Sequence, residues 1–198
     1  FNITIPAQLL NGTGGSADGG LTKLGTGQLT LSGPAGTYNG ATTVSAGSLY
    51  LTTTNHAGGA IIVNDGATLR TTLSAAGDTM NCSSLTLGNT PSDNVTEEFN
   101  VGGFGNPTVA VVHATNLVLN GTVMVNGNAT TKRMPGVMPL VRYDSVSGSA
   151  TFDLNFAQGV GGYITNDTSA KSINLVSVIL PTVVWRALVD TNWDTTTF

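Results

Sequence analysis

Three glycine-to-leucine stretches decide how this chain folds: Gly27-Gln28-Leu29-Thr30-Leu31, Gly47-Ser48-Leu49-Tyr50-Leu51 and Gly66-Ala67-Thr68-Leu69. Leu29, Leu49 and Leu69 stand twenty residues apart, so the three stretches share one period. In the first two stretches apolar and polar residues alternate, which is the pattern of a β-strand buried on one face. We therefore expect the leucines of each stretch to point inward and the residue between them outward: Leu29 and Leu31 flank Thr30, and Leu49 and Leu51 flank Tyr50.

A second strand precedes each of these stretches. An apolar residue stands three positions before each glycine, pairing Leu24 with Gly27, Val44 with Gly47, and Val63 with Gly66. Each unit therefore consists of a strand, a glycine turn and a second strand. Glycine is needed where φ turns positive or backbones approach closely, so we interpret these glycines as structural corners. Similar leucine-rich stretches at residues 84–89 and 116–121 are spaced less regularly, which predicts longer loops between later units.

A repeat of about twenty residues with two or three short strands matches one rung of a parallel β-solenoid. Equivalent leucines of successive rungs would stack into an internal column, and outward Thr and Asn would form hydrogen-bonded ladders at a strand spacing of about 4.8 Å. We predict one all-β unit over residues 1–180, with its clearest repeats at 19–71, and a C-terminal strand or connector at 181–198. The alternative is a β-sandwich of the same composition, which would require hairpins.

Composition excludes several functional classes. Only 9% of the 198 residues are charged, against about 25% in an average soluble domain. No apolar run approaches the roughly 18 residues of a transmembrane helix. The net charge of −4 offers no basic patch for nucleic acid. Cys82 is the only cysteine; it excludes an internal disulfide and is interpreted as a small core side chain.

The acidic residues do not suggest an active site. Glu97 and Glu98 are adjacent, so in a strand they would face opposite sides, and we interpret them as solvated rather than as a glycosidase pair. Asp144 and Asp153 stand alone in the sequence. Lys132-Arg133 is the one basic cluster, in what reads as a loop, so a β-helix enzyme that degrades polysaccharide remains a minor alternative.

Metal and cofactor sites are not predicted either. His56 lies in a loop context and His113 in a strand-like run, and their spacing matches no metal motif. Phosphate-loop, dinucleotide and Gly-x-Ser-x-Gly patterns are missing from the sequence. We expect no catalytic residue, no cofactor and no metal, and hence no enzymatic activity.

The sequence Gly19-Gly20-Leu21-Thr22-Lys23-Leu24-Gly25-Thr26-Gly27-Gln28-Leu29-Thr30-Leu31, continued at residues 38–49, resembles the autotransporter-associated β-strand repeat of large bacterial surface proteins. Both the glycine and the leucine positions of the repeat are in place. Residues 119–123, 136–143, 161–167 and 172–176 resemble material that follows such repeats, and residues 184–197 resemble the opening of a further cassette. The resemblance implies a right-handed parallel β-helix outside the cell or on its surface, with self-association or adhesion as its role and no catalytic residues.

Two functions follow as hypotheses. The first is a structural unit that stacks end to end into a filament, stalk or sheath, with copies of itself or tandem units as partners, because neither end reads as a polar cap. Its end-to-end contacts would involve Phe1, Ile3, Ile5, Trp185, Trp193 and Phe198. The second is an adhesin that binds surface glycans through outward Tyr38, Tyr50 and Tyr163.

Overall fold

The computed structural model describes residues 1–10, 19–56, 58–128, 135–156 and 160–179. Within these ranges the chain is all-β and contains no helix, so none that could cross a membrane. The seven-stranded sheet consists of β1 (Ile3–Ile5), β3 (Gln28–Leu31), β5 (Ser48–Thr52), β7 (Thr68–Thr72), β9 (Asn94–Asn100), β11 (Thr122–Asn128) and β13 (Thr151–Phe156). The eight-stranded sheet consists of β2 (Leu21–Lys23), β4 (Thr42–Val44), β6 (Ala60–Val63), β8 (Met80–Leu87), β10 (Val112–Leu119), β12 (Gly136–Gly148), β15 (Ser172–Ile179) and β14 (Val160–Asp167).

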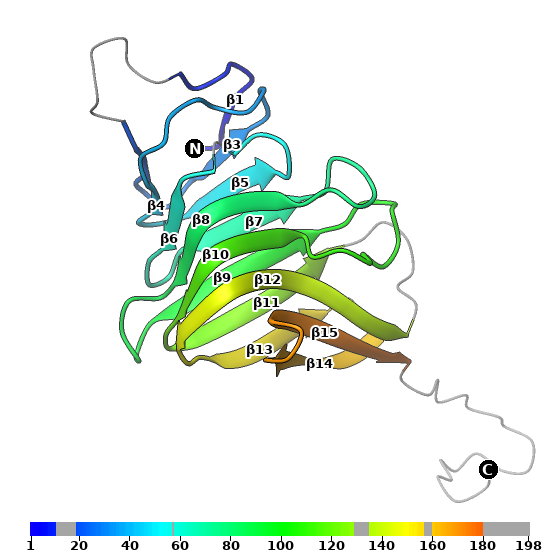
Figure 1. The fold of residues 1–198 in the computed structure, drawn as a ribbon. Coiled ribbons are helices and arrows are strands. Elements are labelled where there is room, and N and C mark those ends of the chain that lie inside the picture. The colour runs from blue at the N-terminus through cyan, green and yellow to red at the C-terminus, as the bar shows by residue number, and fades with distance from the viewer. Residues whose placement is uncertain (11–18, 57, 129–134, 157–159, 180–198) are drawn as a thin grey trace, which may run out of the picture.

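The strands alternate between the two sheets along the chain, so that each turn adds one parallel strand to each sheet. Figure 1 shows the strands stacked in chain order, from β1 at one end to β13, β14 and β15 at the other. The predicted parallel β-solenoid is therefore confirmed, and the β-sandwich built from hairpins is excluded. The apolar side chains of both sheets form one cluster between them.

The internal column of the seven-stranded sheet begins as the sequence indicates. Leu29 pairs with Leu49, and Leu49 with Leu69, each twenty residues apart. The period then lengthens, because Leu69 pairs with Glu97 and Glu97 with Val125, each twenty-eight residues further on. The later rungs contain longer strands and longer loops, as the less regular spacing of the leucine-rich stretches at 84–89 and 116–121 indicates. The twenty-residue rung thus holds only from β3 to β7, because Ile3 on β1 pairs with Leu29 across twenty-six residues.

In the column of inward side chains in the eight-stranded sheet, the prediction for Leu24 is wrong. Val44 pairs with Lys23 and not with Leu24, and Leu24 is 70% exposed. The Lys23 side chain is buried because its ammonium group finds three backbone acceptors at the corner. Its Nζ donates to the carbonyl oxygens of Leu24 at 3.0 Å, Gly25 at 2.7 Å and Ala46 at 3.0 Å. A lysine therefore ties two successive turns together where an apolar residue was expected.

The corner glycines have two different physical reasons. Gly47 and Gly66 have φ angles of 66° and 69°, in the left-handed region that L side chains rarely adopt. Gly27 instead lies against the backbone of the preceding rung, where an added Cβ would overlap the carbonyl oxygen of Phe1. Each corner therefore requires glycine, either for conformation or for close approach.

The two ends of the stack differ in the strands described there, whereas Trp193 and Phe198, which were expected at the second end, lie outside the described residues. At the first end, β1 and β2 are edge strands. At the other end, β15 pairs antiparallel with β12, and β14 pairs antiparallel with β15. The turn of this hairpin is held by Asp167, whose carboxylate accepts the backbone N–H groups of Ser169 and Ala170. The hairpin interrupts the parallel pattern of the eight-stranded sheet, and β14 and β13 are the last strands of the two sheets.

Candidate functional site

The outer face of the eight-stranded sheet carries a row of polar side chains that crosses four neighbouring strands. Asn81 on β8 pairs with His113 on β10, His113 with Arg142 on β12, and Arg142 with Ser172 on β15. The residues that flank Asn81 and His113 on their own strands are buried in the core, so strand alternation turns the row outward. We call this set of four residues the outer row.

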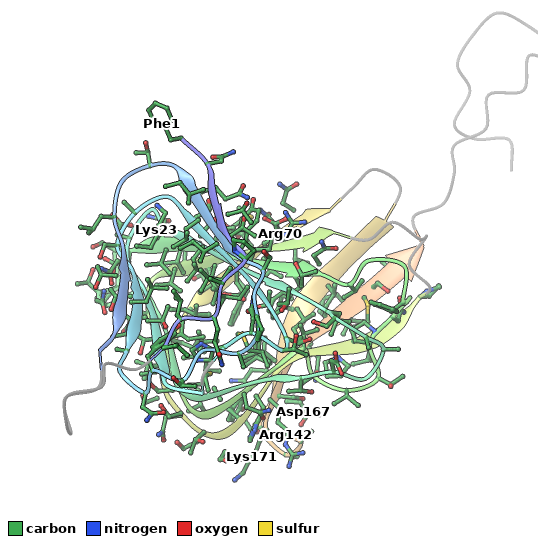
Figure 2. The ribbon with its side chains drawn as sticks, turned by 90° about the horizontal axis from the view of Figure 1, so that it is seen from above. Phe1, Lys23, Arg70, Arg142, Asp167 and Lys171 are labelled. Carbon is green, nitrogen blue, oxygen red and sulfur yellow. The ribbon has the colours of Figure 1, made fainter. Side chains whose placement is uncertain are left out.

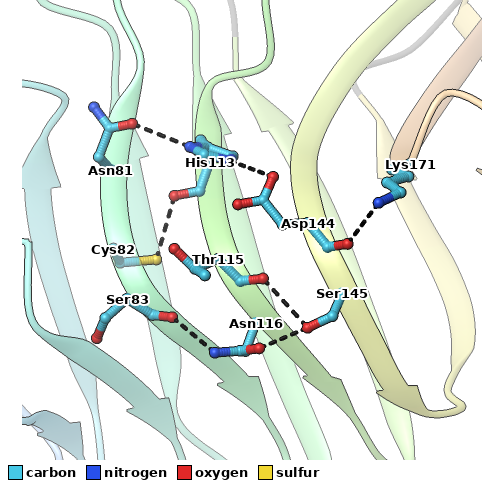
Figure 3. A network of polar contacts seen from close by, with 9 residues as sticks. All are labelled: Asn81, Cys82, Ser83, His113, Thr115, Asn116, Asp144, Ser145 and Lys171. Carbon is cyan, nitrogen blue, oxygen red and sulfur yellow. Dashed lines mark hydrogen bonds and ion pairs between the residues drawn. The ribbon is translucent and has the colours of Figure 1, made fainter.

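His113 links the outer row to the neighbouring polar groups (Figure 3). Its Nδ1 lies 3.3 Å from Oδ1 of Asn81, and its Nε2 lies 3.2 Å from Oδ1 of Asp144. Lys171 Nζ donates to the backbone carbonyl of Asp144 at 2.9 Å. A protonated imidazole can donate to both oxygens, whereas a neutral one donates through one nitrogen only. The contacts therefore fix the ring across three strands.

A second ladder runs beside the first. Asn116 donates to the carbonyl oxygen of Ser83 at 3.4 Å, and Ser145 Oγ lies 2.6 Å from Asn116 Oδ1. These contacts join β8, β10 and β12 through their outward side chains, as Figure 3 shows. They are hydrogen-bonded ladders of the kind expected from a surface with few charges.

A hollow of about 500 Å³ lies over the outer row. It is lined by the four residues of the row together with Thr79, Thr108, Val109, Ala110, Pro139 and Ala170. Arg142 is exposed, and its guanidinium group has no hydrogen bond or ion pair to any residue that the structure describes. Figure 2 places Arg142 close to Asp167 and Lys171, away from Lys23 and Arg70.

The outer face of the seven-stranded sheet carries a different column. Tyr50 pairs with Arg70, and Arg70 with Glu98. The Arg70 guanidinium carbon lies 4.6 Å from the centre of the Tyr50 ring, and Arg70 Nε lies 3.4 Å from Glu98 Oε1. The charge of Arg70 is therefore engaged on both sides by its own sheet.

Glu97 lies inside the core, in the column that begins with three leucines. It is 1% exposed, and neither of its carboxyl oxygens has a hydrogen-bond partner. Burial raises the pKa of Glu97 well above its ordinary value; the nearby Thr71 hydroxyl, whose geometry falls short of a hydrogen bond, partly opposes this rise, and the charge of Glu98 adds to it. A cavity of about 10 Å³ adjoins Glu97 among apolar side chains. The protonated carboxyl is the form that this environment favours.

Glu97, Glu98 and Cys82 are all buried side chains. Glu97 and Glu98 face opposite sides of β9, as predicted, but both are buried, so their interpretation as solvated residues is wrong. The reason is that Glu97 lies in the core column, whereas the contact with Arg70 helps cover Glu98. Cys82 is a core side chain, and burial raises the pKa of its thiol to about 12, with the charge of Glu97 adding to the rise.

The three tyrosines do not form one outward surface. Tyr38 is buried, and its hydroxyl group lies 2.9 Å from Thr42 Oγ1, so its outward placement is wrong. Tyr50 lies on the seven-stranded sheet under Arg70, whereas Tyr163 is 55% exposed on β14 of the other sheet. A glycan surface built from these three residues is therefore not present.

The other residues considered from the sequence lie apart from the hollow. His56 is in the loop after β5, with its Nε2 3.1 Å from the carbonyl oxygen of Gly59. Phe1 and Ile3 are exposed at the open end, whereas Ile5 packs against the core. Lys132, Arg133, Trp185, Trp193 and Phe198 lie outside the described residues. In the part of the chain that is described, no three His, Cys, Asp or Glu side chains gather as a metal site would require.

The outer row itself was not predicted. Its members are separated by 32, 29 and 30 residues along the chain, and no local motif connects them. The signal that could have found them is the strand register of the longer rungs, which brings His113 and Arg142 side by side.

Comparison with known proteins supports the reading of the first rungs. No curated protein and no solved structure matches the chain. Residues 21–51 match the family model of the passenger-associated-transport repeat. The match runs from the first residue of β2 into β5, which covers the first two parallel strand pairs of the repeat. The chain therefore contains an autotransporter passenger repeat, within a parallel β-solenoid.

Proposed function

We propose that this chain is a structural rung stack of a bacterial passenger that is secreted or displayed on the cell surface. Its role is to extend a longer stalk or filament by receiving a further rung at the β1 and β2 edge. The passenger repeat and the solenoid fold support the passenger assignment. The single observation that carries the stacking role is the parallel edge that β1 and β2 present at the first end, whereas the eight-stranded sheet ends in an antiparallel hairpin at the second.

The open end has the chemistry of a docking edge. An edge strand presents unpaired N–H and C=O groups, which are a template for another strand. Large apolar side chains accompany this edge, since Ile3 on β1 is 58% exposed and Phe1, Leu10 and Leu24 are also exposed. The fitting occupant is another rung of the same repeat type, from a neighbouring unit of the polypeptide or from a second copy. Such a rung would pair with β1 and cover Ile3.

Sedimentation velocity and electron microscopy of the purified chain test this proposal. We expect species larger than the monomer at high concentration, and we expect Ile3→Lys to reduce them because a charge is placed on the edge strand. Tyr163→Lys is the matched control, since it places the same charge on exposed β14 at the other end. A chain that stays monomeric, or that loses association equally in both variants, would overturn docking of a second copy at this edge.

We also infer that the chain is not an enzyme. The adjacent acids that a glycosidase would need are not arranged around one substrate, because Glu97 is enclosed in the core and Glu98 contacts Arg70. The His113 imidazole contacts Asn81 and Asp144, and neither is a nucleophile of the hydroxyl or thiol kind. Hydrolysis assays with acidic and neutral polysaccharides test this inference, and turnover that is lost in Glu98→Gln would refute it.

A further inference from the structure

The hollow over the outer row is a concave site with a positive charge, that of Arg142, which no described residue pairs. Its volume of about 500 Å³ lies within the usual range of small-molecule sites, roughly 300–1,000 Å³. Four successive strands supply the outer row, so with a strand spacing of about 4.8 Å the row is roughly 14 Å long. This length suits an elongated ligand better than a single small anion.

Arg142 provides the charge that a ligand would meet. Arg70, the other arginine that the structure describes, is engaged by Tyr50 and Glu98, whereas the guanidinium group of Arg142 has no such partner. Asp144 is on the same strand as Arg142, but its carboxylate lies 3.2 Å from His113 Nε2. A planar guanidinium group matches a carboxylate with two parallel hydrogen bonds. The free group in the hollow is therefore suited to a carboxylate.

The rest of the hollow presents both polar groups and apolar surface. Asn81, Thr108 and Ser172 contribute amide and hydroxyl groups, and Val109 and Pro139 contribute apolar contact. Amides and hydroxyls exchange hydrogen bonds with ligand hydroxyls in either direction. A ligand that carries both a carboxylate and several hydroxyl groups would satisfy the whole lining.

Two other ligand classes fit less well. An extended peptide recognises a sheet through an unpaired edge, but β8, β10 and β12 are each paired on both sides. A divalent cation requires a cluster of oxygen or nitrogen ligands, and the described residues contain no group of three His, Cys, Asp or Glu. The outward face of paired strands therefore favours recognition by side chains alone.

We propose that this hollow binds a carboxylate-bearing saccharide, with Arg142 on the carboxylate and Asn81 and Thr108 on the sugar hydroxyls. The site is separate from the stacking edge, because the outer row belongs to β8, β10, β12 and β15. The binding therefore does not depend on rung stacking, and it can be measured on the chain whether or not it self-associates.

Isothermal titration calorimetry with short oligosaccharides tests the proposal. The probes are oligomers of galacturonic acid and of glucuronic acid, a sialic-acid trisaccharide, and neutral oligomers of the same lengths. We expect at least one acidic probe to bind, no neutral probe to bind as well, and the affinity to fall with added salt. Failure of every acidic probe, or equal binding of a neutral probe, would overturn the proposal.

Variants separate the site from general charge effects. We expect Arg142→Gln to weaken binding about tenfold or more, the loss of a charge-assisted hydrogen-bond pair, and Arg142→Lys to restore it only in part. Arg70→Gln is the matched control, because it removes the same charge from the other sheet. Circular dichroism checks that each variant is folded. Unchanged affinity in folded Arg142→Gln, or an equal loss in Arg70→Gln, contradicts the assignment.

Discussion

Replacing Glu97 with leucine should make this protein more stable. Glu97 follows Leu29, Leu49 and Leu69 in the core column, and its carboxyl oxygens have no hydrogen-bond partner. A buried polar group without a partner costs about 1–3 kcal/mol. We therefore expect Glu97→Leu to raise the free energy of unfolding by roughly that amount at neutral pH, provided that leucine packs beside the adjoining cavity.

The same residue should make stability depend on pH. The folded pKa of Glu97 lies well above its ordinary value of 4.5, so above pH 4.5 the unfolded chain releases a proton that the folded chain retains. The contribution of this group to stability is therefore largest below pH 4.5 and falls as pH rises towards the folded pKa. The slope is about 1.4 kcal/mol per pH unit in that window. Glu97→Leu and Glu97→Gln should both remove this slope.

Urea unfolding between pH 4 and pH 8 measures both effects. Because a stack of rungs can unfold in parts, hydrogen exchange of β7, β9 and β11 should accompany the urea curves. Asp153→Asn is the control, since this acid is exposed on β13 and its removal should leave the slope unchanged. If Glu97→Leu destabilises the protein at every pH, or if its slope equals that of the wild type, the account of Glu97 is wrong.

Three further predictions concern the first rungs and the core. Lys23→Met should lower the free energy of unfolding by about 1–3 kcal/mol, because three carbonyl oxygens lose a charged donor; an unchanged thermal midpoint would contradict this. Gly27→Ala should displace β1, because the added methyl group overlaps the Phe1 carbonyl, and faster hydrogen exchange confined to β1 would be its signature; unchanged exchange there would count against it. The Cys82 thiol is buried and has a pKa of about 12, so at pH 8 it should react with a thiol reagent only as fast as the protein opens. If Cys82 in native buffer is labelled as fast as in the urea-unfolded chain, its burial is refuted.

The first half of the solenoid follows from local pattern, and the second half does not. Alternation and glycine spacing are local properties, and they place Leu29, Leu49 and Leu69 in one register. Twenty residues beyond Leu69 stands Asn89, which lies in the loop before β9, while the true partner is Glu97. Loop length between rungs is not constrained by the core, so the register is lost as soon as a loop grows.

The outer row shows the same limit for the candidate site. His113 and Arg142 become neighbours only because two strands of longer rungs pair across a separation of 29 residues. A lone histidine and a lone arginine in a sequence carry no information about that pairing. The burial of Lys23 could not be predicted for a related reason. Its acceptors are backbone carbonyl oxygens at a corner, and the position of backbone groups cannot be inferred from residue types.

The two ends of the stack also restrict how copies could associate. If two copies met through β1 alone, each would offer the same edge, and such a symmetric contact closes as a dimer. Open-ended growth would require β1 of one copy to pair with the far end of another, where the hairpin of β15 and β14 already closes the eight-stranded sheet. Only the seven-stranded sheet, which ends at β13, could then continue. Head-to-tail contact between separate copies would therefore continue one sheet only, and we expect separate copies to form dimers in preference to long filaments.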